Sequence, residues 1–183
     1  MKSLSSITVA LLFSVFPLIV GYLALGLLPM FLFASGFLGG FVLWLLIPSK
    51  ASFQAIKAPY LWALGFFVLH KLEERYLGFF PALSKVTGVP VPDQASPLAI
   101  LLLLSAAIWL FIPFLMKRGY VLGHYAAWTF FASMGITELA HFFLPFFAEE
   151  PYGYFPGMVT VLVLAPVAWW GIYRLAKTRP KAG

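Results

Sequence analysis

Long runs of apolar residues, separated by short polar segments, dominate the chain. Six runs stand out, each bounded by Pro, Gly or charge, at residues 7–25, 29–47, 59–80, 97–115, 120–144 and 155–173. A helix needs about 20 mostly apolar residues to cross the hydrocarbon core of a bilayer, and each run is close to that length. The pattern predicts an all-α integral membrane protein, a bundle of about six transmembrane helices forming a single polytopic domain over residues 1–183.

Composition narrows the possible chemistry. The chain is 62% hydrophobic and 10% charged, so six spans leave no room for a soluble catalytic domain. It has no cysteine, which excludes disulfides, thiolate nucleophiles and cysteine-based zinc sites. Any chemistry must therefore come from His, Glu and hydroxyl groups. The net charge of +6 does not indicate nucleic-acid binding, because the basic residues form no patch interleaved with aromatic residues.

Basic residues collect in alternate connections between the runs. Nine of the 12 Lys and Arg fall on one predicted side of the membrane, with no acid: Lys2, Lys50, Lys57, Lys117, Arg118, Arg174, Lys177, Arg179 and Lys181. The positive-inside rule then places both termini in the cytoplasm, which means the plasma membrane if the protein is prokaryotic. Lys2 and the following apolar run also resemble a secretory signal, but the run from Ile7 is nearer a full span.

Small residues in the second run suggest a packing face. Gly36 and Gly40 have the small-xxx-small spacing that lets two membrane helices approach closely. The same face could hold two copies of the chain together as a homodimer.

The third run carries ionisable residues at membrane depth. Residues 59–69 number only 11, too few to cross, so the helix must continue through His70-Lys71-Leu72-Glu73-Glu74-Arg75. At about 100° per residue, Glu73 lies about 60° to one side of His70 and Glu74 about 40° to the other. One face of this helix therefore presents an imidazole and two carboxylates.

The fifth run holds the matching polar pair. Glu138 and His141 are three residues apart, so both side chains can point into one site. Glu-x-x-His projecting into a helix bundle is the arrangement with which di-iron and di-manganese carboxylate proteins hold metal. We expect the two polar sets to meet in the outer half of the bilayer. His124 lies about four turns away and is expected to be an interfacial histidine.

The segment His70-Lys71-Leu72-Glu73-Glu74 resembles the motif of the HXXEE family of membrane proteins. The similarity extends to a multi-span chain with a later Glu-x-x-His helix, so it covers most of the sequence. The family has no assigned biochemical activity, and the resemblance implies a site without implying a substrate.

Metal-dependent chemistry is the leading hypothesis. His70, Glu73, Glu74, Glu138 and His141 are the candidate ligands, and they suit one zinc ion or a pair of zinc, iron or manganese ions. Glu73, Glu74 and Glu138 are also the candidate catalytic carboxylates of a hydrolase or oxidoreductase that acts on a lipid-like or otherwise apolar substrate. We expect Glu73 to matter more than Glu74, because Glu73 lies on the flank away from the neighbouring cations.

Two alternatives use the same residues. In the first, the His/Glu cluster works without metal, either as an acid–base isomerase or as the proton relay of a transporter. In the second, the protein is structural, with Lys71 and Arg75 neutralising Glu73 and Glu74. Metal content distinguishes the leading hypothesis from both alternatives.

Overall fold

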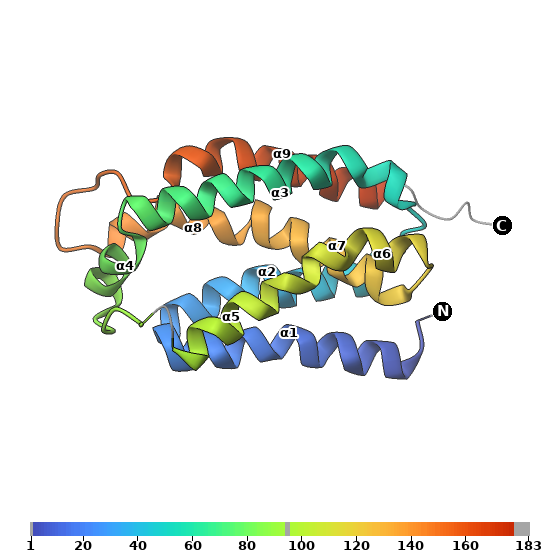
Figure 1. Cartoon of the computed structure of the whole chain (residues 1–183), viewed down its shortest axis with the longest axis horizontal. Helices are drawn as coiled ribbons and strands as arrows, with labels where there is room; N and C mark the ends of the chain where they lie inside the picture. The colour runs from blue at the N-terminus through green and yellow to red at the C-terminus, as the bar shows by residue number, and fades with distance from the viewer. Residues whose placement is uncertain (1, 94–95, 178–183) are drawn as a thin grey trace.

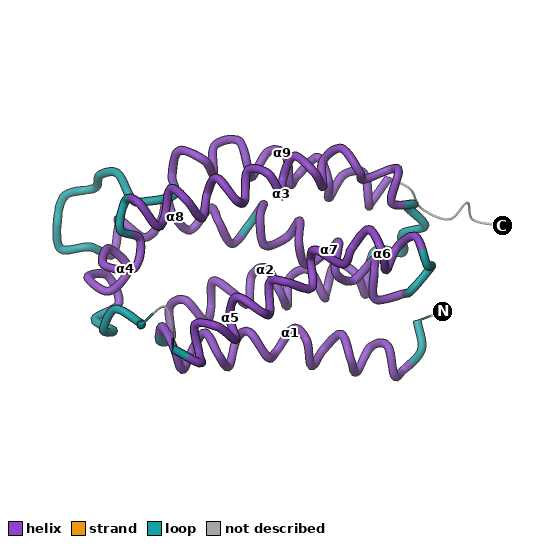
Figure 2. The backbone as a smooth tube through the Cα atoms, viewed as in Figure 1, coloured by secondary structure: helices purple, strands orange, loops and turns teal. Residues whose placement is uncertain are grey.

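The computed structural model describes residues 2–93 and 96–177, and every regular element within those ranges is helical (Figure 1, Figure 2). The helices are α1 (Leu4–Leu25), α2 (Leu27–Leu46), α3 (Phe53–Tyr76), α4 (Phe79–Thr87), α5 (Pro97–Ala107), α6 (Ile112–Lys117), α7 (Val121–Gly135), α8 (Ala140–Phe143) and α9 (Met158–Lys177). Short 3-10 segments are η1 (Ile108–Phe111), η2 (Thr137–Leu139) and η3 (Leu144–Phe147).

The fold is an all-α membrane bundle, as the sequence predicts. Within the described ranges, five helical stretches are long and apolar enough to cross a membrane, with α5 to α6 and α7 to η3 each counted as one stretch. The sixth long helix is α3, which has 24 residues but carries polar groups in its second half. The start of α1 and the end of α9 lie at the same end of the bundle (Figure 1).

The centre of the bundle is α7, which is buried on nearly all sides. It packs against α2, α6 and α9, and Trp128, Phe130 and Phe131 are fully buried. A helix that is buried on nearly all sides forms the interior of the bundle. The close approach of α2 to α7 depends on Gly40, because a Cβ at this position would lie 2.8 Å from the backbone nitrogen of Thr129 on α7. The face containing Gly36 and Gly40 is thus covered by α7 of the same chain, and a homodimer would need another surface.

One buried stripe runs along α3 and ends in the polar residues. Its members are three, four or seven residues apart and include Phe53, Ile56, Tyr60, Ala63, His70 and Glu74. This spacing keeps them on one face of the helix, which packs along α9. His70 and Glu74 therefore occupy positions where the rest of α3 places apolar side chains.

The helix α3 begins six residues before Pro59, at which the third span was predicted to start. Proline has no N–H, so the carbonyl of Ala55, four residues earlier, loses its usual helical partner. The Nε of Arg174 on α9 donates to that carbonyl at 2.8 Å. A neighbouring helix thus satisfies the backbone group that Pro59 leaves unpaired, and α3 continues through the proline.

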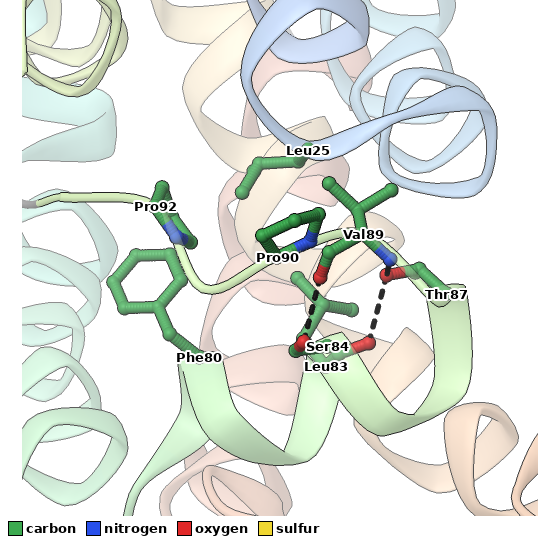
Figure 3. A pocket seen from close by; sticks show the side chains of 8 residues that line it. All are labelled: Leu25, Phe80, Leu83, Ser84, Thr87, Val89, Pro90 and Pro92. Carbon is green, nitrogen blue, oxygen red and sulfur yellow. Dashed lines mark hydrogen bonds between the residues drawn. The ribbon is translucent and has the colours of Figure 1, made fainter.

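The third span also ends earlier than the predicted Phe80. It stops at Tyr76, and Gly78 follows with a φ of 77°, a conformation that favours glycine. The chain then turns into α4. A shallow recess lies between α4, residues 89–92 and Leu25 at the end of α1 (Figure 3). Its lining carries no charged side chain, and the His/Glu residues lie outside it.

The fifth span is broken, whereas the sequence predicted a continuous helix over residues 120–144. The backbone leaves the α-helical ladder at Ile136, and η2, α8 and η3 follow. A side chain on a neighbouring helix satisfies one carbonyl at the break, and a hydroxyl beside the break bonds to α2. Trp169 donates to the carbonyl of Gly135 at 2.7 Å, and the hydroxyl of Thr137 donates to the carbonyl of Leu32 at 3.1 Å. The break determines how Glu138 and His141 are presented.

Candidate metal centre

Two imidazoles and two carboxylates meet between α3 and the segment that follows α7. The Nε2 of His70 lies 3.2 Å from Oε1 of Glu74 and 3.2 Å from Oε2 of Glu138. The Nε2 of His141 lies 3.4 Å from Oε1 of Glu74 and 3.3 Å from Oε2 of Glu138. One ligand atom from each of the four residues lies within 4.8 Å of the other three. We refer to these four residues as the His/Glu cluster.

The cluster is buried, and Lys71 connects it to the surface. Side-chain exposure is 0% for His70 and 3% for His141, and it is 10–11% for the two carboxylates. The ammonium of Lys71 lies 2.7 Å from Oε2 of Glu74 and 3.8 Å from Oε1 of Glu138, and its side chain is 45% exposed. Each carboxylate therefore turns one oxygen towards the imidazoles and the other towards Lys71.

The two halves of the cluster are held by different kinds of backbone. His70 and Glu74 are one turn apart on the continuous helix α3, so their spacing follows from regular helix geometry. Glu138 lies on the 3-10 segment η2, and His141 lies on the four-residue helix α8. As predicted, the polar residues of the third and fifth spans come together.

The imidazole of His141 has a defined hydrogen position. Its Nδ1 lies 2.5 Å from the carbonyl oxygen of Pro156, and a carbonyl can only accept a hydrogen bond. The Nδ1 therefore carries a hydrogen. In the neutral ring, Nε2 then has its lone pair directed at the two carboxylates, which is how a histidine ligand presents itself to a metal.

Glu73 lies outside the cluster, which corrects the expectation that it is the principal carboxylate. Its Oε1 accepts from the backbone N–H groups of Gly157 and Val159, at 3.2 and 3.1 Å. Its Oε2 accepts from the N–H of Thr160 at 2.9 Å and from the Thr160 hydroxyl at 2.5 Å. Glu73 thus caps the N-terminus of α9, while the adjacent Glu74 faces the imidazoles. The angular positions of Glu73 and Glu74 around α3 could not indicate which carboxylate faces the imidazoles. The partner of Glu73 depends on where α9 begins.

Sequence reasoning missed the segment before α9. Tyr154 donates to Oε1 of Glu73 at 2.5 Å, and burial together with this neighbouring carboxylate raises the pKa of Tyr154 to about 12. The phenol therefore stays protonated and donating at neutral pH. Gly157 has a φ of 104°, and an added Cβ would lie 2.5 Å from Nδ1 of His141. The Pro156-Gly157 dipeptide was the only local signal of this turn.

His124 takes no part in the cluster. Its Nε2 lies 3.0 Å from the carbonyl oxygen of Ala51, near the beginning of α3. This backbone contact agrees with the structural role expected for His124.

Four of the six pairwise separations within the cluster resemble those of a metal site, and one ligand atom of each residue lies within 4.8 Å of the other three. In a tetrahedral zinc site with bonds of about 2.0–2.1 Å, neighbouring ligand atoms lie about 3.3 Å apart. The four His–Glu separations of 3.2–3.4 Å are close to that value. Charge is also compatible, because one dication in place of two imidazolium protons leaves the net charge of the cluster unchanged.

Comparison of the chain with protein-family models, with curated proteins and with solved structures gave no match. The resemblance to the HXXEE family therefore stays a prediction from the motif.

Proposed function

We propose that this protein is an integral membrane enzyme whose His/Glu cluster holds one divalent metal ion. The ligands are His70, Glu74, Glu138 and His141. The observation that carries the proposal is the set of four His–Glu separations of 3.2–3.4 Å in a buried position. The five candidate ligands predicted from the sequence were compatible with one ion or with two. Because Glu73 is bonded to the start of α9, four ligands remain, and four ligands favour one ion.

Zinc, iron and manganese all suit two imidazole nitrogens and two carboxylate oxygens. Such an ion activates water or dioxygen, so the reaction class is that of a hydrolase or an oxidoreductase. The chain supplies the surroundings. Lys71 neutralises the outer carboxylate oxygens, and its side chain, 45% exposed, lies between the cluster and the exterior.

The substrate we propose is lipid-like. Apolar side chains lie beside Lys71 on α3, where Val68 is 55% and Leu72 43% exposed. The Lys71 ammonium lies 5.2 Å from the ring centre of Phe67, and the exposed Arg75 follows one turn further on. In a membrane protein such apolar side chains contact acyl chains rather than water. A substrate that is itself apolar can therefore reach Lys71 sideways from the bilayer.

The orientation we propose has both termini in the cytoplasm. The start of α1 and the end of α9 lie at one end of the bundle (Figure 1), and α9 ends at Lys177. Lys2 bonds to the carbonyl of Leu45 near the end of α2, Lys50 follows α2, and Lys117 lies over the ring of Phe53 at the start of α3. The positive-inside rule assigns that end to the cytoplasm. Arg179 and Lys181, which contribute to the bias, lie outside the described residues. The cluster, close to the opposite end of α3, is then in the outer half of the membrane.

A metal-free acid–base enzyme is the second candidate, and one observation favours it. When both imidazoles are protonated, their Nε2–H groups can donate to the same carboxylate oxygens, so the cluster is satisfied without an ion. In that case the residues that move protons are the same His/Glu cluster. The two candidates differ in metal content.

Elemental analysis tests the proposal. The protein is purified in detergent without chelators, and zinc, iron and manganese are measured in wild type, His141→Ala and the control Glu149→Gln. We expect about one ion per chain in wild type and in the control, and a large loss in His141→Ala. A wild type that holds far less than one ion and takes up none on titration would overturn the metal proposal and favour the acid–base candidate.

A second experiment tests whether the protein is an enzyme. Wild type and Glu138→Gln are placed in vesicles made from a total lipid extract, and the lipids are compared by mass spectrometry after incubation. We expect product masses that form with wild type and are missing with Glu138→Gln. Identical lipid profiles from metal-loaded wild type and empty vesicles would contradict an activity on membrane lipids.

A further inference from the structure

Glu73 and Thr160 lie outside the His/Glu cluster, yet they contact it through the ring of His70. The Nδ1 of His70 lies 2.9 Å from the hydroxyl oxygen of Thr160. That hydroxyl also lies 2.5 Å from Oε2 of Glu73. The three groups form one hydrogen-bonded line that begins at α9 and ends at Nε2 of His70.

The direction of the hydrogen bonds follows from the number of hydrogens. A threonine hydroxyl has one hydrogen, and a carboxylate only accepts. At 2.5 Å the hydroxyl of Thr160 donates to Glu73, so it must accept from His70. The Nδ1 of His70 consequently carries its hydrogen, and in the neutral ring the lone pair of Nε2 faces Glu74 and Glu138.

Glu73 is itself held firmly, which is why it can fix Thr160. Backbone N–H groups of Gly157, Val159 and Thr160 all donate to it, at the positive end of the α9 dipole. These bonds join the first turn of α9 to the last turns of α3. Any motion that separates the two helices would therefore also release the ring of His70.

We propose that Glu73 and Thr160 are a positioning pair that holds the His70 ring with Nδ1–H outwards and Nε2 towards Glu74 and Glu138. This inference rests on the proposed function for its effect on metal affinity, but the orientation of the ring can be measured without metal. It gives the adjacent carboxylates of the motif different roles: Glu74 belongs to the His/Glu cluster, while Glu73 orients His70 from outside it.

The test compares Thr160→Val with Thr160→Ser. Valine has nearly the shape of threonine without the hydroxyl, whereas serine keeps the hydroxyl. Cobalt(II) affinity is measured by titration in detergent, with Thr87→Val as a matched control, because Thr87 bonds only within α4 and the residues just after it. We expect about 10- to 100-fold weaker binding for Thr160→Val, the usual effect of losing a partner behind a histidine ligand, and little change for the other two. Equal cobalt affinity of Thr160→Val and wild type would overturn the effect on metal binding.

Nitrogen NMR of histidine-labelled protein provides the second readout. The chain has three histidines, so single substitutions assign the signals. In metal-free wild type, under alkaline conditions that leave imidazole neutral, we expect the hydrogen of His70 on Nδ1. A hydrogen on Nε2 would overturn the positioning role, even if Thr160→Val failed to fold. Wild type without metal affinity but with the hydrogen on Nδ1 would refute the proposed function and leave the positioning pair standing.

Discussion

Glu73 and Glu74 are neighbours on α3, but their carboxylates contact different helices. Glu74 lies 3.2 Å from Nε2 of His70 and 3.4 Å from Nε2 of His141, whereas Glu73 accepts hydrogen bonds from the first turn of α9. This arrangement requires that the same substitution have different effects at the two positions.

Glu74→Gln should lose metal and Glu73→Gln should keep it. An amide cannot supply the charge that the ion requires, so Glu74→Gln should bind cobalt more weakly than any variant of the positioning pair. Glu73→Gln should reach full stoichiometry at saturating cobalt, although with lower affinity and a lower thermal midpoint. Metal content after dialysis and unfolding in detergent measure the two effects. The reverse ranking would restore Glu73 as the principal ligand.

Metal affinity should fall as the solution becomes more acidic. Each Nε2 must be unprotonated to bind a metal, so protons and the ion compete for His70 and His141. Binding should therefore be weak at about pH 5 and should strengthen as the solution becomes alkaline. Cobalt titrations across this range measure the trend. His124→Gln is the control and should show the same pH dependence, and an affinity that is independent of pH would mean that the imidazoles are not ligands.

Gly40→Ala should destabilise the bundle, and the adjacent Gly39→Ala should not. A Cβ at Gly40 would lie 2.5 Å from Cα and 2.8 Å from N of Thr129, whereas a Cβ at Gly39 has nothing within 4 Å. Separating α2 from α7 should lower the free energy of unfolding by about 1–3 kcal/mol, as overpacking usually does. Denaturant titration in detergent measures the free energy of unfolding of Gly40→Ala and of Gly39→Ala. Equal stabilities would show that α2 and α7 do not approach as closely as described.

Gly157→Ala should displace the two imidazole rings of the His/Glu cluster. The backbone there has a φ of 104°, and the new methyl group would lie 2.5 Å from Nδ1 of His141 and 2.7 Å from Cε1 of His70. Both rings would have to move, so the variant should bind cobalt more weakly and melt earlier. Gly153→Ala is the control, since its Cβ would meet nothing closer than 3.7 Å. Unchanged cobalt affinity in Gly157→Ala would show that the turn at Gly157 lies further from the imidazole rings of His70 and His141.

The sequence was sufficient to predict the bundle, because span length and composition depend mainly on the bilayer. It also predicted that polar residues of the third and fifth spans meet. Two things could not be derived from it. One is that α3 starts at Phe53 and continues through Pro59, where Arg174 bonds the carbonyl that the proline leaves unpaired; the other is that Glu73 bonds to Thr160. Both contacts join segments that are far apart in the chain.

The break at Ile136 gives the two sides of the cluster different mechanical stiffness. His70 and Glu74 lie on the long α-helix α3, more than two turns after Pro59, while Glu138 and His141 are carried by consecutive short turns. Short turns deform at lower energetic cost than a long helix, because fewer cooperative backbone bonds must change together. If the cluster binds a ligand as proposed, we expect residues 137–143 to adjust more than α3 does.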